Sequence, residues 1–249
     1  MIPPTSIDGT DITGATIDGT DVQEITVDGD VVFSAVSDAI LSDDFDDNQL
    51  LSNRTSYSSL AWGGPNPNGK FNPIGRFNWD TGSPQNSPSA SGGELVLQPG
   101  EACYQNVTFD LSNAKTIWEF EWDLTNSGTG GSSAVVFTLF APSNPTFSNK
   151  VPDDAYSLWF NANNFSDIRF RLTQNGNTST LNSGGNVGTN VIDIRVERDT
   201  NGTFEVFQSN SSVFTVTDTT FTTGGSVGLA TGSGDVGTHR IDYVAVYEE

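Results

Sequence analysis

One tryptophan and three polar residues are spaced so that they could share one face of a sheet and bind a sugar. Alternating apolar residues predict two strands, one in which Trp159 and Asn161 point away from the core and one in which Arg169 and Arg171 do. An indole can stack on a sugar ring, while amide and guanidinium groups hydrogen-bond its hydroxyls or a carboxylate. These four residues are therefore the first candidates for a ligand-binding surface.

A structural role is the competing interpretation of the same residues. Arg169 and Arg171 could instead pair with Glu119 and Glu121 across strands, each exposed pair contributing under about 1 kcal/mol. Trp159 would then be covered by a long loop.

That loop is the stretch between Trp62 and Gly93, which is rich in Gly, Pro, Asn and Ser and carries Phe71, Phe77 and Trp79. Loops beyond about 15 residues are uncommon in compact domains unless they are functional or mobile. Because a solvated loop gains nothing by exposing aromatic side chains, the sequence favours a binding loop or a subunit contact. Phe77 and Trp79 join the candidate ligand-binding residues.

Nucleophilic catalysis and zinc binding are disfavoured because the residues they need are scarce. The chain has one cysteine, Cys103, and one histidine, His239. Neither an internal disulfide nor a Cys/His zinc cluster can form from these. His239 follows a Gly-rich segment without any nucleophile motif, so the sequence predicts a turn histidine.

The elements that would position these residues are short strands. After Ser37, alternating segments separated by Gly, Asn and Ser show no helical period, which predicts an all-β sandwich. The expected strands are residues 94–97, 116–124, 134–140, 156–161, 168–172, 191–198, 203–208, 226–230 and 240–247.

The same alternation assigns side chains to faces. The side chains expected in the core are Trp118, Phe120, Trp122, Tyr156, Leu158 and Phe160. Those expected outside include Glu119, Glu121, Asp123, Asp193, Arg195 and Glu197. The outer face of one sheet is therefore expected to carry Trp159 together with several arginines and several acids.

The N-terminal 36 residues contain a short repeat. Three copies lie ten residues apart: Ile7-Asp8-Gly9-Thr10, Ile17-Asp18-Gly19-Thr20 and Val27-Asp28-Gly29-Asp30. Asp-Gly accepts the positive φ of a tight turn, and β-branched residues flank it, which predicts β-hairpins. An element this small cannot bury a core, so residues 1–36 must pack on the rest of the chain, on sister subunits or on a larger particle.

Residues 17–33 of this repeat resemble the N-terminal segments of structural and tail-appendage proteins of tailed viruses, particularly those of halophilic archaea. The resemblance implies assembly with other virion proteins. A β-meander that leads into a secreted domain is the alternative.

The net charge of the chain limits the classes of molecule that it is expected to bind. Acidic residues outnumber basic ones 31 to 10, for a net charge of -21. This charge repels phosphates and anionic lipids, so neither nucleic acid nor a membrane is an expected partner. The acids are spread along the chain, which favours a protein kept soluble in high salt over ordinary acidic solubilisation. The N-terminus has no secretory-signal pattern, so synthesis in the host cytoplasm and exposure on the released virion are expected.

Both ends of the larger region carry family-like motifs: Leu41-Ser42-Asp43-Asp44-Phe45-Asp46-Asp47-Asn48-Gln49-Leu50 and Ile241-Asp242-Tyr243-Val244-Ala245-Val246-Tyr247. They resemble the concanavalin A-like lectin/glucanase superfamily, including laminarinase-type β-glucanases. For residues 37–249 this resemblance implies a jelly-roll sandwich of two antiparallel sheets whose first and last strands lie close together.

The resemblance does not extend to the catalytic motif. Retaining glucanases of this family carry Glu-x-Asp-x-x-Glu, because two carboxylates must flank the glycosidic bond about 5 to 5.5 Å apart. The nearest match is Glu121-Trp122-Asp123-Leu124-Thr125-Asn126, where an amide replaces the acid/base. Glu121 and Asp123 are therefore interpreted as a solvated or ion-paired sheet face, and no catalytic residue is expected.

The glucanases that the chain resembles also bind a structural Ca²⁺ through an acid of the last strand, near the first strand. By this resemblance Asp242 and Asp44 are the candidate ligands, since Ca²⁺ prefers hard oxygen donors. The alternative is that both acids are solvated or cap turns.

These observations favour a non-enzymatic, oligomeric virion surface or tail appendage. Residues 1–36 would anchor it, and the lectin-like domain would bind a host-surface glycan or glycoprotein, with multivalent display raising avidity. One alternative is a purely structural capsid or tail decoration protein. Another is an extracellular carbohydrate-binding module, or an inactive glucanase, of a halophile.

Overall fold

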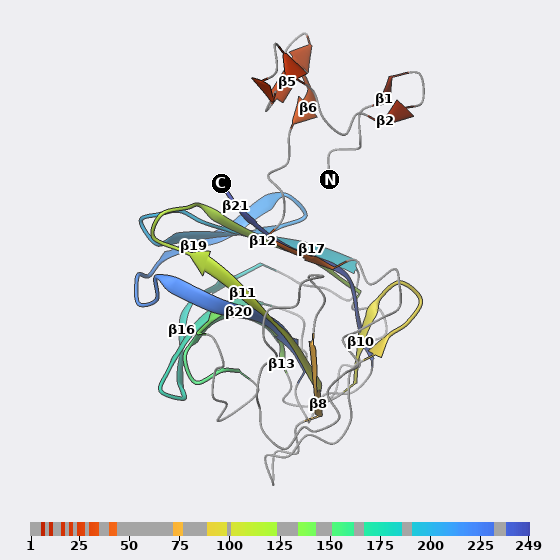
Figure 1. The fold of residues 1–249 in the computed structure, drawn as a ribbon. Helices are drawn as coiled ribbons and strands as arrows, with labels where there is room; N and C mark the ends of the chain where they lie inside the picture. Colours follow the sequence, from red (N-terminus) through yellow and green to blue (C-terminus); the bar gives the residue numbers. More distant parts are fainter. Residues whose placement is uncertain are drawn as a thin grey trace. The chain divides into compact units, whose positions relative to one another are not determined.

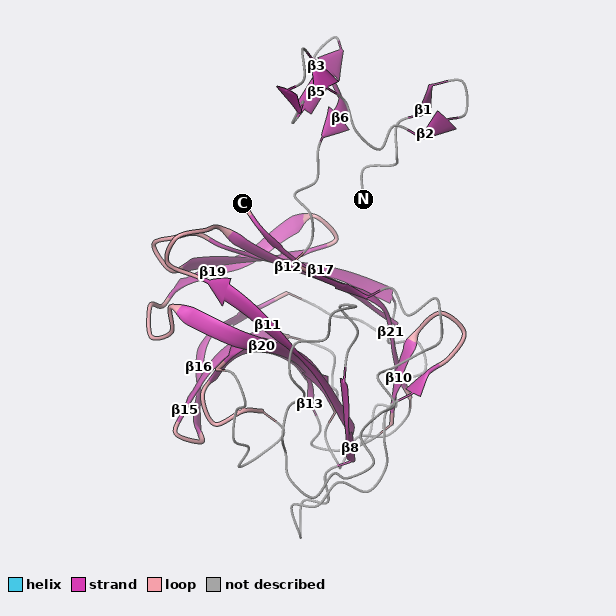
Figure 2. Ribbon diagram, viewed as in Figure 1, coloured by secondary structure: helices cyan, strands magenta, loops and turns pink. Residues whose placement is uncertain are grey.

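The computed structural model describes residues 40–43, 72–76, 89–98, 101–123, 134–142, 151–161, 167–185, 191–231 and 238–249, together with short N-terminal strands. Every regular element in these ranges is a β-strand (Figure 2). Among the residues so described, no helix could cross a membrane. The chain divides into two compact units, Met1–Ala39 and Ile40–Glu249.

The N-terminal unit consists of antiparallel hairpins, as the repeat predicts. The pairs are β1 (Ser6–Ile7) with β2 (Thr10–Asp11), β3 (Thr16–Ile17) with β4 (Thr20–Asp21), and β5 (Glu24–Val27) with β6 (Asp30–Ser34). One Asp-Gly copy separates the two strands of each pair in the sequence, as expected for a two-residue hairpin connection.

The second unit is a sandwich of two antiparallel sheets (Figure 1). The eight-stranded sheet has the order β19-β18-β17-β12-β21-β10-β9, and β7 also pairs with β21. Its strands are β7 (Leu41–Asp43), β9 (Ser89–Ala90), β10 (Leu95–Leu97), β12 (Thr116–Asp123), β17 (Val191–Arg198), β18 (Thr203–Gln208), β19 (Ser211–Thr217) and β21 (His239–Glu248).

The other sheet has seven strands in the order β16-β15-β14-β13-β20-β11-β8. These strands are β8 (Asn72–Arg76), β11 (Glu101–Asp110), β13 (Ala134–Ala141), β14 (Ala155–Asn161), β15 (Ile168–Gln174), β16 (Asn177–Gly184) and β20 (Thr223–Ala230).

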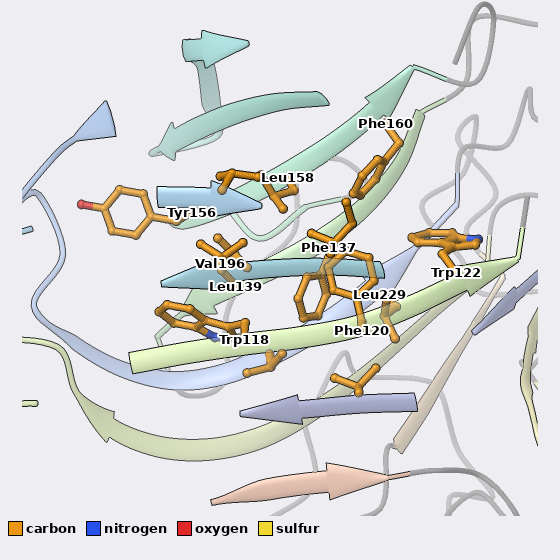
Figure 3. Packing of buried hydrophobic residues seen from close by; sticks show 14 of the residues in the cluster. Trp118, Phe120, Trp122, Phe137, Leu139, Tyr156, Leu158, Phe160, Val196 and Leu229 are labelled. Carbon is orange, nitrogen blue, oxygen red and sulfur yellow. The ribbon is translucent and has the colours of Figure 1, made fainter. Parts of the chain in front are cut away.

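Aromatic side chains fill the space between the two sheets (Figure 3). Phe120 of β12 lies 4.2 Å from Phe137 of β13, and 5.8 Å from Phe160 of β14, between ring centroids. The inward faces expected for residues 118–122 and 156–160 are confirmed, because all six of the predicted core side chains are buried. Such interdigitated rings bury the most apolar area per residue, which makes this layer the main source of stability.

The first and last strands of the sandwich lie side by side. β7 pairs with β21 so that Leu41 stands opposite Val246 and Asp43 opposite Val244. This closure confirms the jelly-roll expectation for the two terminal motifs.

Several edge strands were not expected from the sequence. β8 lies inside the stretch between Trp62 and Gly93, so the prediction of one uninterrupted loop there is wrong. It contains Pro73 and Gly75, and a proline without an N–H is tolerated at a sheet edge, where β8 lies. Every residue of β16 is exposed or partly exposed, so the strand shows no apolar alternation.

Candidate functional site

The candidates Trp159, Arg169 and Arg171 lie on the outer face of the seven-stranded sheet, which points away from the main core. Two neighbouring rows of side chains run across the strands of this face. One row, strand by strand, is Arg169, Trp159, Val136, Ala230 and Ala102. The next row is Arg171, Ser157, Thr138, Gly228 and Tyr104. We call these ten residues the Trp159 face. The structure thus brings Trp159, Arg169 and Arg171 together, as alternation predicts.

Trp159 is buried on this face, with 8% of its surface exposed. It belongs to a small cluster, separate from the main core, with Tyr104, Val136 and Val151 among its members. Its indole Nε1–H donates to Ser157 Oγ at 2.9 Å. The expectation of an exposed tryptophan is therefore wrong: it points outward, but neighbouring groups cover it, which alternation along one strand cannot reveal.

Arg171 lies over the indole of Trp159, with its Cζ 4.2 Å from the ring centroid. Burial lowers the pKa of Arg171, and the charge of Arg169 lowers it further. The Nε–H of Arg171 is buried without a hydrogen-bond acceptor. A cation–π contact of this kind holds the guanidinium in place, and it does not satisfy the Nε–H as a hydrogen bond would.

Arg169 is held by a neighbouring acid. Its Nε donates to Asp167 Oδ2 at 2.6 Å, and 37% of its side chain is exposed. The alternative pairing of the two arginines with Glu119 and Glu121 is wrong, because those acids belong to the other sheet.

Tyr104 and Gly228 complete the centre of the face. The Tyr104 ring occupies the space where a Cβ on Gly228 would lie. Its hydroxyl is 3.4 Å from Thr138 Oγ1. Sequence reasoning missed Tyr104, Thr138 and Ser157. The alternation of Ala102 and Tyr104 could have indicated a strand. The polar residues directly after Tyr104 interrupt that alternation, so no strand was predicted there.

The remaining candidate sugar ligands are only partly described. Asn161 is the last residue of β14, and its side chain lies outside the described part of the structure. Phe77 and Trp79 also lie outside the described residues. Phe77 directly follows β8, the edge strand of the same sheet.

The outer face of the eight-stranded sheet is acidic. Glu121 stands opposite Asp193, and Glu119 opposite Arg195. Burial, followed by a hydrogen bond with Asp193, raises the pKa of Glu121 to about 7. The expectation that one face carries both the tryptophan and these acids is wrong. β12 and β14 belong to different sheets, and residue alternation does not report which sheet a strand joins.

Of the two candidate calcium ligands, Asp242 lies on the last strand, two residues before the segment of β21 that pairs with β7. Asp242 is an exposed residue of β21, while Asp44 lies outside the described residues, directly after β7. In the described ranges, no group of three or more His, Cys, Asp or Glu residues could hold a metal ion. A site here would therefore need oxygen donors from Asp44 or its neighbours.

His239 is the first residue of β21 and is fully buried, so the prediction of a turn histidine is wrong. Its ring packs edge-on against Trp122, with 5.8 Å between centroids. Its position inside the sandwich gives it a packing role.

No family model and no curated protein matches the chain. Among solved structures, the carbohydrate recognition domain of Emp47p matches with a TM-score of 0.56 and 16% identity, over 76% of this chain and 92% of that one. The exoplasmic/lumenal domain of VIP36 matches in its metal-free form with a TM-score of 0.53 and 10% identity, over 76% of this chain and 90% of that one. Its Ca²⁺/Man-bound form matches with a TM-score of 0.51 and 9% identity, over 65% of this chain and 80% of that one. The sandwich therefore has the concanavalin A-like lectin fold.

Proposed function

We propose that this chain is a non-catalytic glycan-binding protein and that a saccharide binds at Arg169 and Arg171, the two partly exposed residues of the Trp159 face, whose other eight residues are buried. The observation that carries the proposal is the cluster of Trp159, Arg169 and Arg171 on one face of a lectin-type sandwich. The indole fixes Arg171, and the two guanidinium groups supply the directed hydrogen bonds that orient a saccharide. The carbohydrate recognition domain of Emp47p has the same fold, which supports this class of ligand.

The distribution of carboxylates supports a binding role without hydrolysis. A glycosidase needs two carboxylates that flank the bond to be cleaved. Glu121 and Asp193 form such a close acidic pair, but they lie on the outer face of the eight-stranded sheet. The core of the sandwich separates them from Trp159, so a saccharide bound at the Trp159 face is out of their reach.

The setting that we propose is the surface or tail of a virion. The hairpins β1–β6 would join the chain to other virion proteins and to sister copies, and the sandwich would contact host glycans or glycoproteins after release. Multiple copies would raise a weak single-site affinity. Removing residues 1–36 should then abolish incorporation into particles, and normal incorporation would contradict the anchoring role.

Glycan-array binding by the full-length chain tests the proposed function. Binding to specific glycans is expected, and it should fall in Arg169→Gln and Arg171→Gln variants. Arg240→Gln is the matched control, because Arg240 pairs with Glu94 on the eight-stranded sheet. A protein that binds no glycan, yet still incorporates into a particle, would instead be a purely structural decoration protein.

Calcium is a second, separable part of the proposal. Asp242 and Asp44 would supply carboxylate oxygens, which suit this ion, and it would tie the first strand of the sandwich to the last. VIP36 has been solved in a Ca²⁺/Man-bound form, which supports a metal in this fold. Millimolar Ca²⁺ at fixed ionic strength should raise the melting temperature of the wild type but not of Asp242→Asn. An equal response of both proteins would remove this site.

A further inference from the structure

We infer that the saccharide bound at the Trp159 face is acidic, carrying a carboxylate or a sulfate. This inference rests on the proposed function and narrows its ligand class. Three features of the molecule support it: the balance of charge on this face, the contacts that hold Arg171, and the ion pairs of the other basic residues.

The charge on this face is opposite to that of the whole chain. The protein has 10 basic residues and a net charge of -21, yet two arginines stand two positions apart on the same side of β15. Within the described residues, the only carboxylate that forms an ion pair with either of them is Asp167, which pairs with Arg169. The local excess of positive charge favours an anion.

Three partly exposed basic residues on the eight-stranded side provide the contrast, whereas Arg198 of the same sheet is buried and donates to the carbonyl oxygens of Leu111 and Asp199. Arg195 pairs with Glu197 at 3.2 Å and Arg240 with Glu94 at 2.6 Å. Lys115, which precedes β12, pairs with both Glu197 and Glu249. Each of these three cations forms an ion pair with a carboxylate, whereas no described carboxylate forms an ion pair with Arg171, and Asp167 acts on it only at longer range.

Arg171 is also held ready to bind. Trp159 lies beneath its guanidinium, and Ser157 fixes the indole. An arginine with a fixed plane loses little side-chain entropy on binding, and its fork of N–H groups matches the two oxygens of a carboxylate or sulfate. The pKa of Arg171 is lowered by burial and by Arg169, and a bound anion would favour the charged form. A neutral hydroxyl cannot compensate this charge.

Matched acidic and neutral probes test the inference on the full-length chain by calorimetric titration. The probes are oligogalacturonate and its methyl ester, a sialylated and a desialylated complex N-glycan, and a heparin hexasaccharide and its desulfated form. At least one acidic member should bind about tenfold or more tightly than its neutral partner. Preference within the uronate or sialate pair indicates a carboxylate, and preference within the heparin pair indicates a sulfate.

Variants assign the preference to the arginines. Arg171→Gln and Arg169→Gln should each lower the affinity for the acidic probe about tenfold, and lower the affinity for the neutral probe by a smaller factor. Arg171→Lys keeps the charge but loses the fork, so it should bind the acidic probe with intermediate affinity. Arg240→Gln removes the same charge from the eight-stranded sheet and should leave both affinities unchanged. Arg169 is the more exposed arginine, so Arg169→Gln keeps the test valid if Arg171→Gln fails to fold.

The outcomes separate the inference from the function on which it rests. Equal affinity for acidic and neutral partners, with binding that still falls in both arginine variants, would overturn the inference and leave the proposed function intact. Binding to neutral glycans alone would do the same. An acidic preference that both arginine variants retain would overturn the inference and also the assignment of the binding surface to the Trp159 face. Binding to no saccharide at all would overturn both.

Discussion

Arg171 and Glu121 are half-buried charged residues on opposite outer faces of the sandwich, and their surroundings differ in kind. Arg171 lies on an aromatic ring next to another cation. Glu121 lies next to Asp193, Asp242 and Asp123, all of which raise its pKa. In both cases burial is the largest cause of the shift, and a neighbour of like charge increases it.

The raised pKa of Glu121 predicts a pH-dependent stability. The folded-state pKa of about 7 exceeds the ordinary value of 4.5, so the folded state binds the proton more tightly. Stability should therefore fall as the pH rises from about 4.5 through 7. Glu121→Gln mimics the protonated form and should be more stable than the wild type at pH 8, by on the order of 1 kcal/mol after allowance for solvent screening.

Denaturant unfolding at pH 5 and pH 8 checks this prediction. Glu205→Gln, on strand β18 of the same sheet, removes one negative charge elsewhere and is the control for net charge. If Glu121→Gln and Glu205→Gln change the free energy of unfolding at pH 8 equally, the proximity of Glu121 to Asp193 does not cause the effect.

The burial of Trp159 predicts that its removal destabilises the fold. Trp159→Ala should lower the free energy of unfolding by about 3 kcal/mol, since it loses a buried indole, its hydrogen bond to Ser157 and its contact with Arg171. Phe207→Ala is the matched control: Phe207 also lies beneath an arginine, with 4.5 Å from Arg195 Cζ to the ring centroid, but it is partly exposed. Chemical denaturation that gives equal losses for the two variants would contradict the assignment.

At the scale of the strand, β11 and β20 are neighbours, and the ring of Tyr104 on β11 lies where a side chain at position 228 of β20 would lie. Tyr104 of β11 stands opposite Gly228 of β20 and covers it. Glycine lets the aromatic ring lie flat on the sheet, which explains a glycine in the interior of a central strand, where it otherwise weakens the sheet.

Gly228→Ala should therefore destabilise the protein by about 1 to 3 kcal/mol, because the added Cβ forces the Tyr104 ring to move. In a Tyr104→Ala background the same substitution should cost far less. A double-mutant cycle by denaturant unfolding measures this coupling. Additive effects of the two substitutions would mean that the ring does not depend on this glycine.

Most interior strands were predictable because their alternation is strong, but the interior strand β11 was missed, since polar residues follow Tyr104. β17 and β18 have the bounds that the sequence predicts, and β12 differs by one residue at its end. The edge strands β8, β9, β16 and β19 were also missed, since an edge position tolerates proline and polar residues and leaves no apolar period. The sequence also placed Arg169, Arg171 and Trp159 on one face correctly. It could not reveal that Trp159 is covered, or that the acids belong to the other sheet, because both depend on tertiary pairing.

At the scale of the whole molecule, net charge opposes folding. The chain carries a charge of -21, and self-repulsion of this size destabilises a compact state. The hairpin unit Met1–Ala39 and the sandwich Ile40–Glu249 are separate compact units, and the core lies in the second.

The melting temperature should accordingly rise between low and molar salt. The screening length falls from about 10 Å at 0.1 M to about 3 Å at 1 M, which weakens repulsion among the surface acids. Thermal melts in NaCl and in KCl check this expectation. A midpoint that does not change with salt would remove the interpretation of the chain as adapted to high salt.

Nuclear magnetic resonance of the full-length chain tests most directly whether the Trp159 face binds a glycan. The signals to follow, on addition of a glycan selected from the array, are the indole N–H of Trp159 and the Nε–H of Arg171. Trp118 and Trp122 are internal controls, because both are fully buried in the main core. We predict that the Trp159 and Arg171 signals shift with saturation while the two control indoles do not. Saturable shifts confined to Arg195 and Lys115, on the side of the eight-stranded sheet, would contradict the account.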